Sequence, residues 1–151
     1  MSEIIVRTAK KTDYPTLERI YFIDRYRDFP WVNQPQLTDF ERDSRHEYIL
    51  VAVIDQKVVG FLSFYRLANF IHLLFVDPAY RHQHVGYRLI ETMRQSATGL
   101  MQLKVVTTNF SARAFYERLG FQETKRDDLA TPPNITLTDT RRDQYPFLAL
   151  Y

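Results

Sequence analysis

A basic segment that follows an apolar run carries the residues best suited to chemistry. The run Phe70–Val76 predicts a buried strand, and Asp77-Pro78 ends it because proline lacks the N–H that a strand ladder needs. Arg81 follows, and a pattern of helical period begins at Val85. The first N–H groups of a helix have no partner within it and point toward any nearby anion. The order of strand, short loop and helix therefore predicts a binding site for phosphate groups.

The composition is that of an ordinary globular domain and narrows the possible chemistry. The chain has 151 residues, 45% of them hydrophobic and 25% charged, which predicts a single domain, 1–151. A formal net charge of +2 is too small to favour nucleic acid as a partner. The chain has no cysteine, which excludes thiol catalysis, disulfides and thiolate metal sites. No signal peptide or membrane span is recognisable, so we expect a cytoplasmic protein without a membrane partner.

The remaining patterns predict the elements that position the phosphate loop. Apolar or alternating segments predict strands at 4–7, 48–54, 58–65, 70–76, 101–107, 121–126 and 147–151. Periodicity and capping residues predict helices that start near residues 12, 38, 85 and 111. The first helix should place Leu17, Ile20, Tyr21 and Asp24 on one face, and 129–145 should be a long polar excursion. We therefore expect an α/β fold with a mixed, mostly antiparallel central sheet of about seven strands, flanked by about four helices.

A second motif joins the phosphate loop and brings a family resemblance. It consists of Asn109, Ala112, Phe115, Tyr116, Gly120 and Phe121. Together with Val76-Asp77-Pro78, Arg81, Val85 and Gly86, it resembles the GNAT superfamily of acyl-CoA-dependent N-acyltransferases. In that family, V-x-P leads to Q/R-x-x-G-x-G/A, and N-x-x-A-x-x-F-Y-x-x-x-G-F follows. The resemblance covers nearly the whole chain, is strongest from 70 to 121, and implies a GNAT-like fold with acetyl-CoA as cosubstrate.

The resemblance also implies where acetyl-CoA would bind. Backbone groups at the end of the fourth strand would accompany the pantetheine arm, and the loop N–H groups would hold the diphosphate. Arg113 and Arg118 could meet the 3′-phosphate, although solvated arginines on the helix face are the alternative. The implied cofactor-binding residues are Leu74, Phe75, Val76, Arg81, His82, Gln83, His84, Val85, Gly86, Asn109 and Arg113. His84 stands where the family has its first loop glycine, and a histidine can serve at this position if its φ is negative.

Tyr116 and His72 are the catalytic residues that the resemblance implies. Tyr116 matches the usual proton donor to the leaving thiolate; the alternative is a tyrosine packed beside Phe115. His72 stands where many relatives carry a glutamate that deprotonates the amine, and strand alternation would place it on one face with Phe70 and Leu74. A core histidine bonded to backbone is the alternative. His72, His82 and His84 lack a recognisable ligand spacing, so no metal is expected.

The acceptor is expected to enter between the first two helices and the hairpin. Tyr26, Phe29 and Trp31 could form an apolar wall, and Asp24 and Asp28 would favour a cationic amine. A loop held to the core by its aromatic side chains is the alternative. The expected acceptor is a small-molecule amine or a peptide N-terminus.

The sequence therefore predicts an N-acetyltransferase, and two other classes compete with it. Without cysteine, a route through a covalent acyl-thioenzyme is excluded, so the amine should attack acetyl-CoA directly in a ternary complex. A non-catalytic acyl-CoA sensor on the same fold is the first alternative. A nucleic-acid binder rests only on basic pairs such as Arg141-Arg142, which the near-neutral charge opposes. The 129–145 segment and the C-terminal strand are candidate contacts for a homodimer.

Overall fold

The computed structural model describes residues 2–28, 32–141 and 145–146, and its strands form one sheet. The strands are β1 Ile4–Thr8, β2 Tyr48–Ile54, β3 Lys57–Tyr65, β4 Phe70–Val76, β5 Gln102–Val106, β6 Phe121–Asp127 and β7 Asn134–Asp139. Within the sheet they lie in the order β1-β2-β3-β4-β5-β7-β6. All neighbouring pairs are antiparallel except β4 with β5, which are parallel. The predicted mixed, mostly antiparallel sheet of about seven strands is confirmed.

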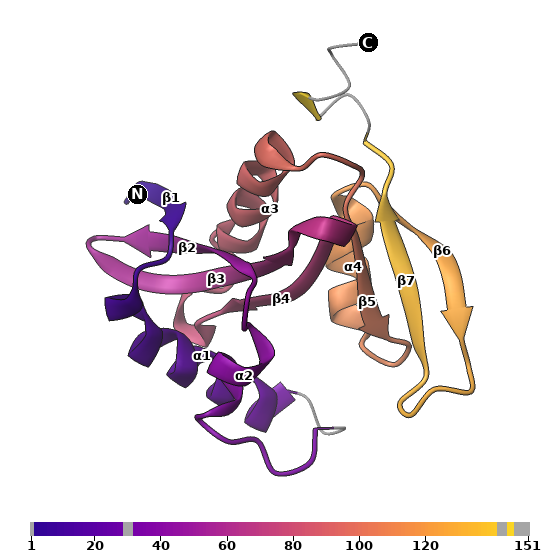
Figure 1. Cartoon of the computed structure of the whole chain (residues 1–151), viewed down its shortest axis with the longest axis horizontal. Coiled ribbons are helices and arrows are strands. Elements are labelled where there is room, and N and C mark those ends of the chain that lie inside the picture. Colours follow the sequence, from indigo (N-terminus) through magenta and orange to yellow (C-terminus); the bar gives the residue numbers. More distant parts are fainter. Residues whose placement is uncertain (1, 29–31, 142–144, 147–151) are drawn as a thin grey trace.

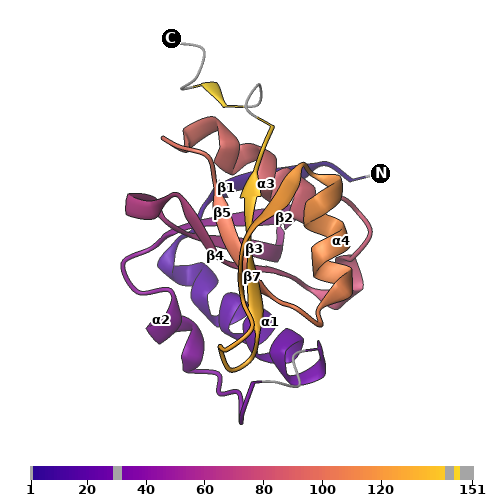
Figure 2. The ribbon, with the colours of Figure 1, turned by 90° about the vertical axis from the view of Figure 1, so that its right-hand side faces the viewer.

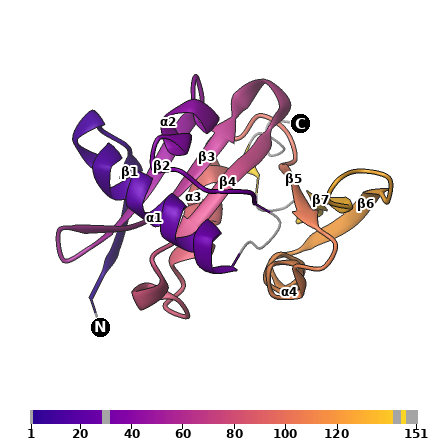
Figure 3. The ribbon, with the colours of Figure 1, turned by 90° about the horizontal axis from the view of Figure 1, so that it is seen from below.

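Helices lie on both faces of the sheet. The α-helices in the described residues are α1 Tyr14–Asp28, α2 Asp39–Asp43, α3 Val85–Ser96 and α4 Phe110–Arg118. Figure 1 shows α1 and α2 on one side of the sheet and α3 on the other. Figure 3 shows α4 beside β5, β6 and β7, away from α1 and α2. The α4 helix packs mainly against β6.

Two apolar clusters bind these layers together. On the α1 side, Leu17, Ile20 and Tyr21 pack with Phe61 and Phe75 of the sheet. Asp24 is also buried, which confirms the predicted face of α1. On the α3 side, the buried residues of the helix are packed against those of β2, β3, β5 and β7. Burial of apolar surface on both faces is the main driving force for such an assembly.

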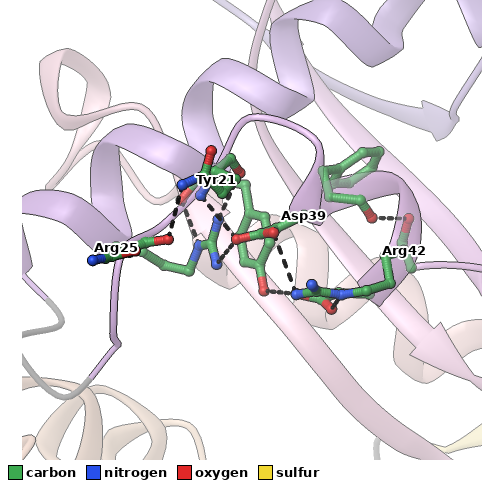
Figure 4. A network of polar contacts seen from close by, with 9 residues as sticks. Tyr21, Arg25, Asp39 and Arg42 are labelled. Carbon is green, nitrogen blue, oxygen red and sulfur yellow. Dashed lines mark hydrogen bonds and ion pairs between the residues drawn. The ribbon is translucent and has the colours of Figure 1, made fainter.

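A polar network fixes the short helix α2 to α1 (Figure 4). Asp39 accepts hydrogen bonds from the Arg25 guanidinium at 3.0 Å and from the backbone N–H of Gln36 at 2.9 Å. The Arg25 guanidinium lies 3.7 Å from the centroid of the Tyr21 ring, and the Tyr21 hydroxyl donates to Asp43 at 2.6 Å. Burial, together with this hydrogen bond, raises the pKa of Tyr21.

The sheet opens between β4 and β5. These strands pair at a single position, Phe70 opposite Gln102, whereas β3 and β4 pair along the whole of β4. Figure 2 views the molecule from the β6 side and shows α3 and α1 on opposite sides of the sheet, with α4 next to β6. On the side of β5, the backbone of β4 beyond Phe70 therefore faces the opening rather than a paired strand.

The prediction that 129–145 forms an excursion without a strand is wrong. Asn134–Asp139 forms β7, which lies between β5 and β6. Its Ile135 and Leu137 side chains are buried in the apolar core, and Thr136 between them is buried as well, so both faces of the strand are covered. The strand predicted at 147–151 lies outside the described residues. In the described ranges, the helices are too short or too polar to cross a membrane.

Candidate functional site

A cavity of about 1080 Å³ lies where the end of β4 meets the start of α3 and one side of α4. Three elements of the predicted site therefore meet at one place. Its lining comprises Asp24, Leu74, Val76, Tyr80, Arg81, His82, His84, Val85, Gly86, Tyr87, Asn109, Ser111, Ala112, Ala114, Phe115, Tyr116, Arg118 and Leu119. Most of the predicted cofactor-binding residues belong to this set.

The loop before α3 has an unusual backbone. His84 is the N-cap of α3 with φ +66°, and His82 has φ +63°. The negative φ that was the condition for a histidine at position 84 is therefore not met. Both histidines adopt the left-handed conformation that glycine tolerates best, so the loop keeps a glycine-like path with two imidazoles added.

Gly86 has a separate reason to be glycine. A Cβ at this position would lie 3.0 Å from Cζ of Phe115, which is on α4. The absence of a side chain therefore allows the first turn of α3 to approach α4 closely. This contact places the two predicted motifs side by side.

A second, smaller cavity of about 240 Å³ adjoins the first. Leu74, Asn109, Ala112 and Tyr116 line both cavities. The smaller cavity is otherwise lined by His72, Phe75, Lys104, Val105 and Val106. Tyr116 thus lies where the two spaces meet.

The Tyr116 ring is held by aromatic contacts. Its centroid lies 5.0 Å from that of Phe115 and 5.6 Å from that of Phe121, both edge to face. Burial raises the pKa of Tyr116, so the phenol is protonated at neutral pH. Within the described part of the chain, no hydrogen bond of the protein engages its hydroxyl. The hydroxyl is therefore available to a ligand.

His72 pairs with a carboxylate that the sequence analysis did not select. Its Nδ1 lies 2.7 Å from Oε2 of Glu47, and the Ser63 hydroxyl donates to Oε1 of the same carboxylate. Ser63 lies opposite Leu73 and Phe64 lies opposite Ile71, so the register shift leaves His72 in a bulge of β4.

The bulge corrects the predicted orientation of His72. Leu62 and Phe64 both pack on the α3 side of the sheet, so Ser63 between them faces the α1 side. Ser63 and His72 bond to the same Glu47 carboxylate there, whereas Leu74 packs on the α3 side. His72 is therefore neither on one face with Leu74 nor a core histidine bonded to backbone.

Asp24 and Arg81, predicted for the acceptor and the cofactor respectively, form an ion pair. Arg81 donates to Oδ1 of Asp24 at 2.7 Å, and the Asp24 side chain is only 6% exposed. The pair joins α1 to the loop before α3. Because both residues line the large cavity, this contact fixes one of its walls.

The other predicted residues take different positions. Asn109 caps α4, since its side-chain oxygen accepts from the N–H of Ala112 at 3.3 Å. Arg113 donates to the carbonyl of Thr107 at 2.9 Å and does not line the large cavity, whereas Arg118 does.

Four further predicted positions lie away from both cavities or cannot be placed. Gln83 is exposed and lines neither cavity. Tyr26 is 73% exposed and also lines neither cavity. Phe29 and Trp31 lie outside the described residues.

Glu47 and Ser63 are the site residues that sequence reasoning missed. Glu47 directly precedes β2 and lies 25 residues before its partner His72. An acidic residue before a strand carries no local signal of such a contact. Among the residues that the structure describes, no three His, Cys, Asp or Glu side chains gather as metal ligands would.

Residues 14–121 match the model of the acetyltransferase (GNAT) family. The chain belongs to this family. The matched range includes the phosphate loop, the second motif and Glu47.

The individual curated relatives match only part of the chain. The chain is similar to the uncharacterized N-acetyltransferase YafP of Escherichia coli K12, with 36% identity over 78 residues, 52% of this chain and 48% of YafP. It is 32% identical over 102 residues to the N-alpha-acetyltransferase RimI of Mycobacterium tuberculosis, 63% of each chain. The matches thus span about half to two thirds of these curated relatives. The solution structure of apo YjaB from Escherichia coli superposes with a TM-score of 0.73 at 26% identity, covering 91% of this chain and 98% of YjaB.

Proposed function

We propose that the protein transfers an acetyl group from acetyl-CoA to a primary amine by direct attack within a ternary complex. One observation carries the proposal. Tyr116, with its protonated phenol, lies where a large cavity meets a small one that His72 lines. A donor for the leaving thiolate and a base for the amine are thus available on the two sides of one reaction point.

Acetyl-CoA fits the large cavity by its chemistry. The diphosphate would lie at the start of α3, where the helix N–H groups and dipole favour an anion. Arg118 also lines this space and adds positive charge, whereas the charge of Arg81 is paired with that of Asp24. The pantetheine amides would bond to the β4 backbone at Leu74 to Val76, which the divergence of β5 leaves facing the opening. These are the residues that the resemblance implied.

The amine would enter from the smaller cavity. Its nitrogen attacks the thioester carbon and forms the C–N bond, and the C–S bond then breaks. The amine loses a proton to His72, and the coenzyme A thiolate takes a proton from Tyr116. No covalent enzyme intermediate through sulfur is available, because the chain has no cysteine.

A small-molecule amine is the acceptor class that we favour. The smaller cavity has a volume of only about 240 Å³, which suits a compact amine or the end of a chain. A peptide N-terminus is the second candidate, because the similar protein RimI is named an N-alpha-acetyltransferase. The two classes differ in what surrounds the amine and can be separated by a substrate panel.

Calorimetry and thiol release test the proposal directly. We expect acetyl-CoA to bind with one site per chain, and at least one amine of a panel of small amines and short peptides to release coenzyme A thiol. Tyr116→Phe should keep the binding and lose most of the release. If coenzyme A fails to bind, the proposal is overturned.

A non-catalytic acyl-CoA sensor is the second candidate function. The two histidines with positive φ favour it, because their imidazoles occupy a loop that must come close to the diphosphate. Binding of acetyl-CoA without thiol release for any amine would support the sensor over the enzyme.

A further inference from the structure

Glu47 has a geometry that packing alone does not require. Its side chain is only 11% exposed, yet it carries a carboxylate with both oxygens engaged by β3 and β4. Burial of a carboxylate is unfavourable unless hydrogen bonds compensate for the lost water. Oε1 accepts from the fully buried Ser63 hydroxyl, and Oε2 meets Nδ1 of His72 at 2.7 Å.

A backbone hydrogen bond of Glu47 also holds this residue in place, in addition to the two side-chain contacts of its carboxylate. The N–H of Glu47 donates to the carbonyl of Ser44 at 3.0 Å, in the turn that follows α2. The Ser44 hydroxyl in turn donates to the carbonyl of Phe40 at 2.7 Å. Glu47 is therefore held from α2, from β3 and from the bulge in β4.

We propose that Glu47 is a positioning residue that orients His72 and sets its tautomer for proton transfer. The proposal rests on the proposed acetyltransferase function. An ionised carboxylate only accepts, so Nδ1 of His72 must carry the proton in this pair. The lone pair is then on Nε2, the other ring nitrogen. The His72 side chain is 40% exposed and lines the smaller cavity, so this nitrogen belongs to the part of the ring that the carboxylate does not cover.

The proton transfer then balances. As the amine nitrogen forms its bond to the thioester carbon, one N–H proton moves to Nε2 of His72. The imidazolium that results is stabilised by the negative charge of the Glu47 carboxylate. Tyr116 gives its proton to the thiolate, and water restores both residues after the products leave. Glu47 itself exchanges no proton.

The other polar groups around His72 cannot take the role of Glu47 as the negatively charged acceptor for the ring N–H. Lys104 of β5 and the protonated Tyr116 of α4 line the same cavity. Lys104 is a cation that only donates, and the Tyr116 hydroxyl is a neutral group that brings no negative charge to an imidazolium. Among the described residues, the Glu47 carboxylate is thus the group that can hold the Nδ1 proton.

The tautomer can be measured without any activity. In ¹⁵N-labelled protein, the ring nitrogen shifts report which nitrogen is protonated, and His72→Ala identifies the signals of His72. We expect the Nδ1–H form in the wild type and a shift toward the Nε2–H form in Glu47→Gln. Glu123→Gln is the matched control, because Glu123 pairs with Arg126 on β6, away from both cavities.

Kinetics test whether the orientation matters for transfer. We expect Glu47→Gln to lower kcat roughly 10- to 100-fold with little change in the KM for acetyl-CoA. Glu47→Asp keeps the carboxylate and should recover part of the loss, and Ser63→Ala should lower kcat less than Glu47→Gln. Thermal unfolding of each variant serves as the control that checks whether the fold persists.

A double-mutant cycle decides between positioning and an independent role. If Glu47 acts through His72, Glu47→Gln has no further effect in the His72→Ala background. Equal losses in both backgrounds would overturn the proposal, as would an unchanged tautomer in Glu47→Gln. Should no amine be acetylated, the proposed function fails, while the tautomer measurement still decides whether Glu47 sets the protonation of His72.

Discussion

At the scale of single residues, the Tyr116 hydroxyl is expected to act in the chemical step and not in the binding of coenzyme A. Tyr116→Phe removes that oxygen and keeps the edge-to-face contacts with Phe115 and Phe121. We expect kcat to fall about 100-fold, because a general acid contributes roughly 10²- to 10⁴-fold, with coenzyme A affinity unchanged. Steady-state kinetics and calorimetry measure the two effects. An unchanged kcat would exclude Tyr116 as the donor.

The raised pKa of Tyr116 predicts how the rate of transfer depends on pH. Burial raises the pKa of Tyr116, so deprotonation of the donor occurs only at strongly alkaline pH. The rate should therefore not fall between neutral pH and about pH 10, the ordinary pKa of tyrosine. Tyr48→Phe is the control, because that hydroxyl bonds to Thr8 and lines neither cavity.

His84 makes the loop before α3 less stable than it could be. A residue with a Cβ is strained at φ +66°, and glycine is not. We expect His84→Gly to raise the free energy of unfolding by about 0.5–1 kcal/mol, measured by urea denaturation. His84→Ala keeps the strained φ and loses the imidazole, so it should not stabilise the protein. Equal effects of Gly and Ala would show that backbone strain is not the cause.

Among single residues, the sequence predicted those that belong to a local motif. It missed those whose partners lie on another strand of the sheet. Gly86, Asn109 and Tyr116 belong to local motifs, and each lines the large cavity. Glu47 meets His72 only because β4 has a bulge, which shifts one residue against β3. A bulge breaks the alternation from which strand faces are predicted, so this pair was not visible in the sequence.

Between elements, the contact of α3 with α4 depends on the absence of one methyl group. Gly86→Ala improves helix propensity by about 1 kcal/mol, but its Cβ would lie 3.0 Å from the Phe115 ring. We expect a net loss of stability of about 1 kcal/mol or more, because the overpacking outweighs the propensity. Coenzyme A affinity should fall as well, since Phe115 moves with its neighbour Tyr116.

A compensating change tests that cause. Gly86→Ala with Phe115→Leu removes the ring that the new methyl group meets, and stability should recover relative to Phe115→Leu alone. Urea denaturation of the four proteins gives the coupling free energy. Strictly additive effects would contradict the steric explanation.

The predicted elements match where apolar periodicity is strong and fail where polar residues have buried partners. The strands β1 to β5 and the helix α3 lie close to their predicted ranges. β7 was missed because Thr136, Thr138 and Asp139 made the segment look polar. Asp139 is fully buried, and Arg94 and Tyr145 both bond to its Oδ2 at 2.7 Å. Such long-range partners turn a polar residue into a core residue, and a local pattern cannot show them.

At the scale of the whole molecule, the site exists because two parts of the sheet diverge and are tied at one end. The part with β1 to β4 meets the part with β5 to β7 at one strand pair, Phe70 with Gln102. Arg94 of α3 bonds to Asp139 of β7 and, at 2.6 Å, to the carbonyl of Leu119 at the end of α4. The buried ion pair therefore joins the phosphate-loop helix to the part that carries Tyr116.

Stability in acid is a property of the whole fold and depends on carboxylates that are ionised in the native state. The hydrogen bond from Arg7 lowers the pKa of Asp13, against the opposing effect of burial. Burial alone would raise the pKa of Asp39, but the hydrogen bonds from Gln36 and Arg25 outweigh it and lower the pKa. A lowered pKa in the folded state means that each group stabilises the fold above its unfolded pKa, and that this contribution is lost as the pH falls through the folded pKa.

Asp39→Asn isolates one of these contributions. At pH 7 we expect a loss of about 3 kcal/mol in the free energy of unfolding, because Arg25 is buried and loses its carboxylate. Below about pH 4, where unfolded aspartate becomes protonated, the difference from the wild type should shrink. Urea denaturation from pH 7 to pH 3 measures both effects, with Asp128→Asn as the control because that carboxylate is 69% exposed. A difference that stays constant across this range would show that Asp39 contributes by packing rather than by its charge.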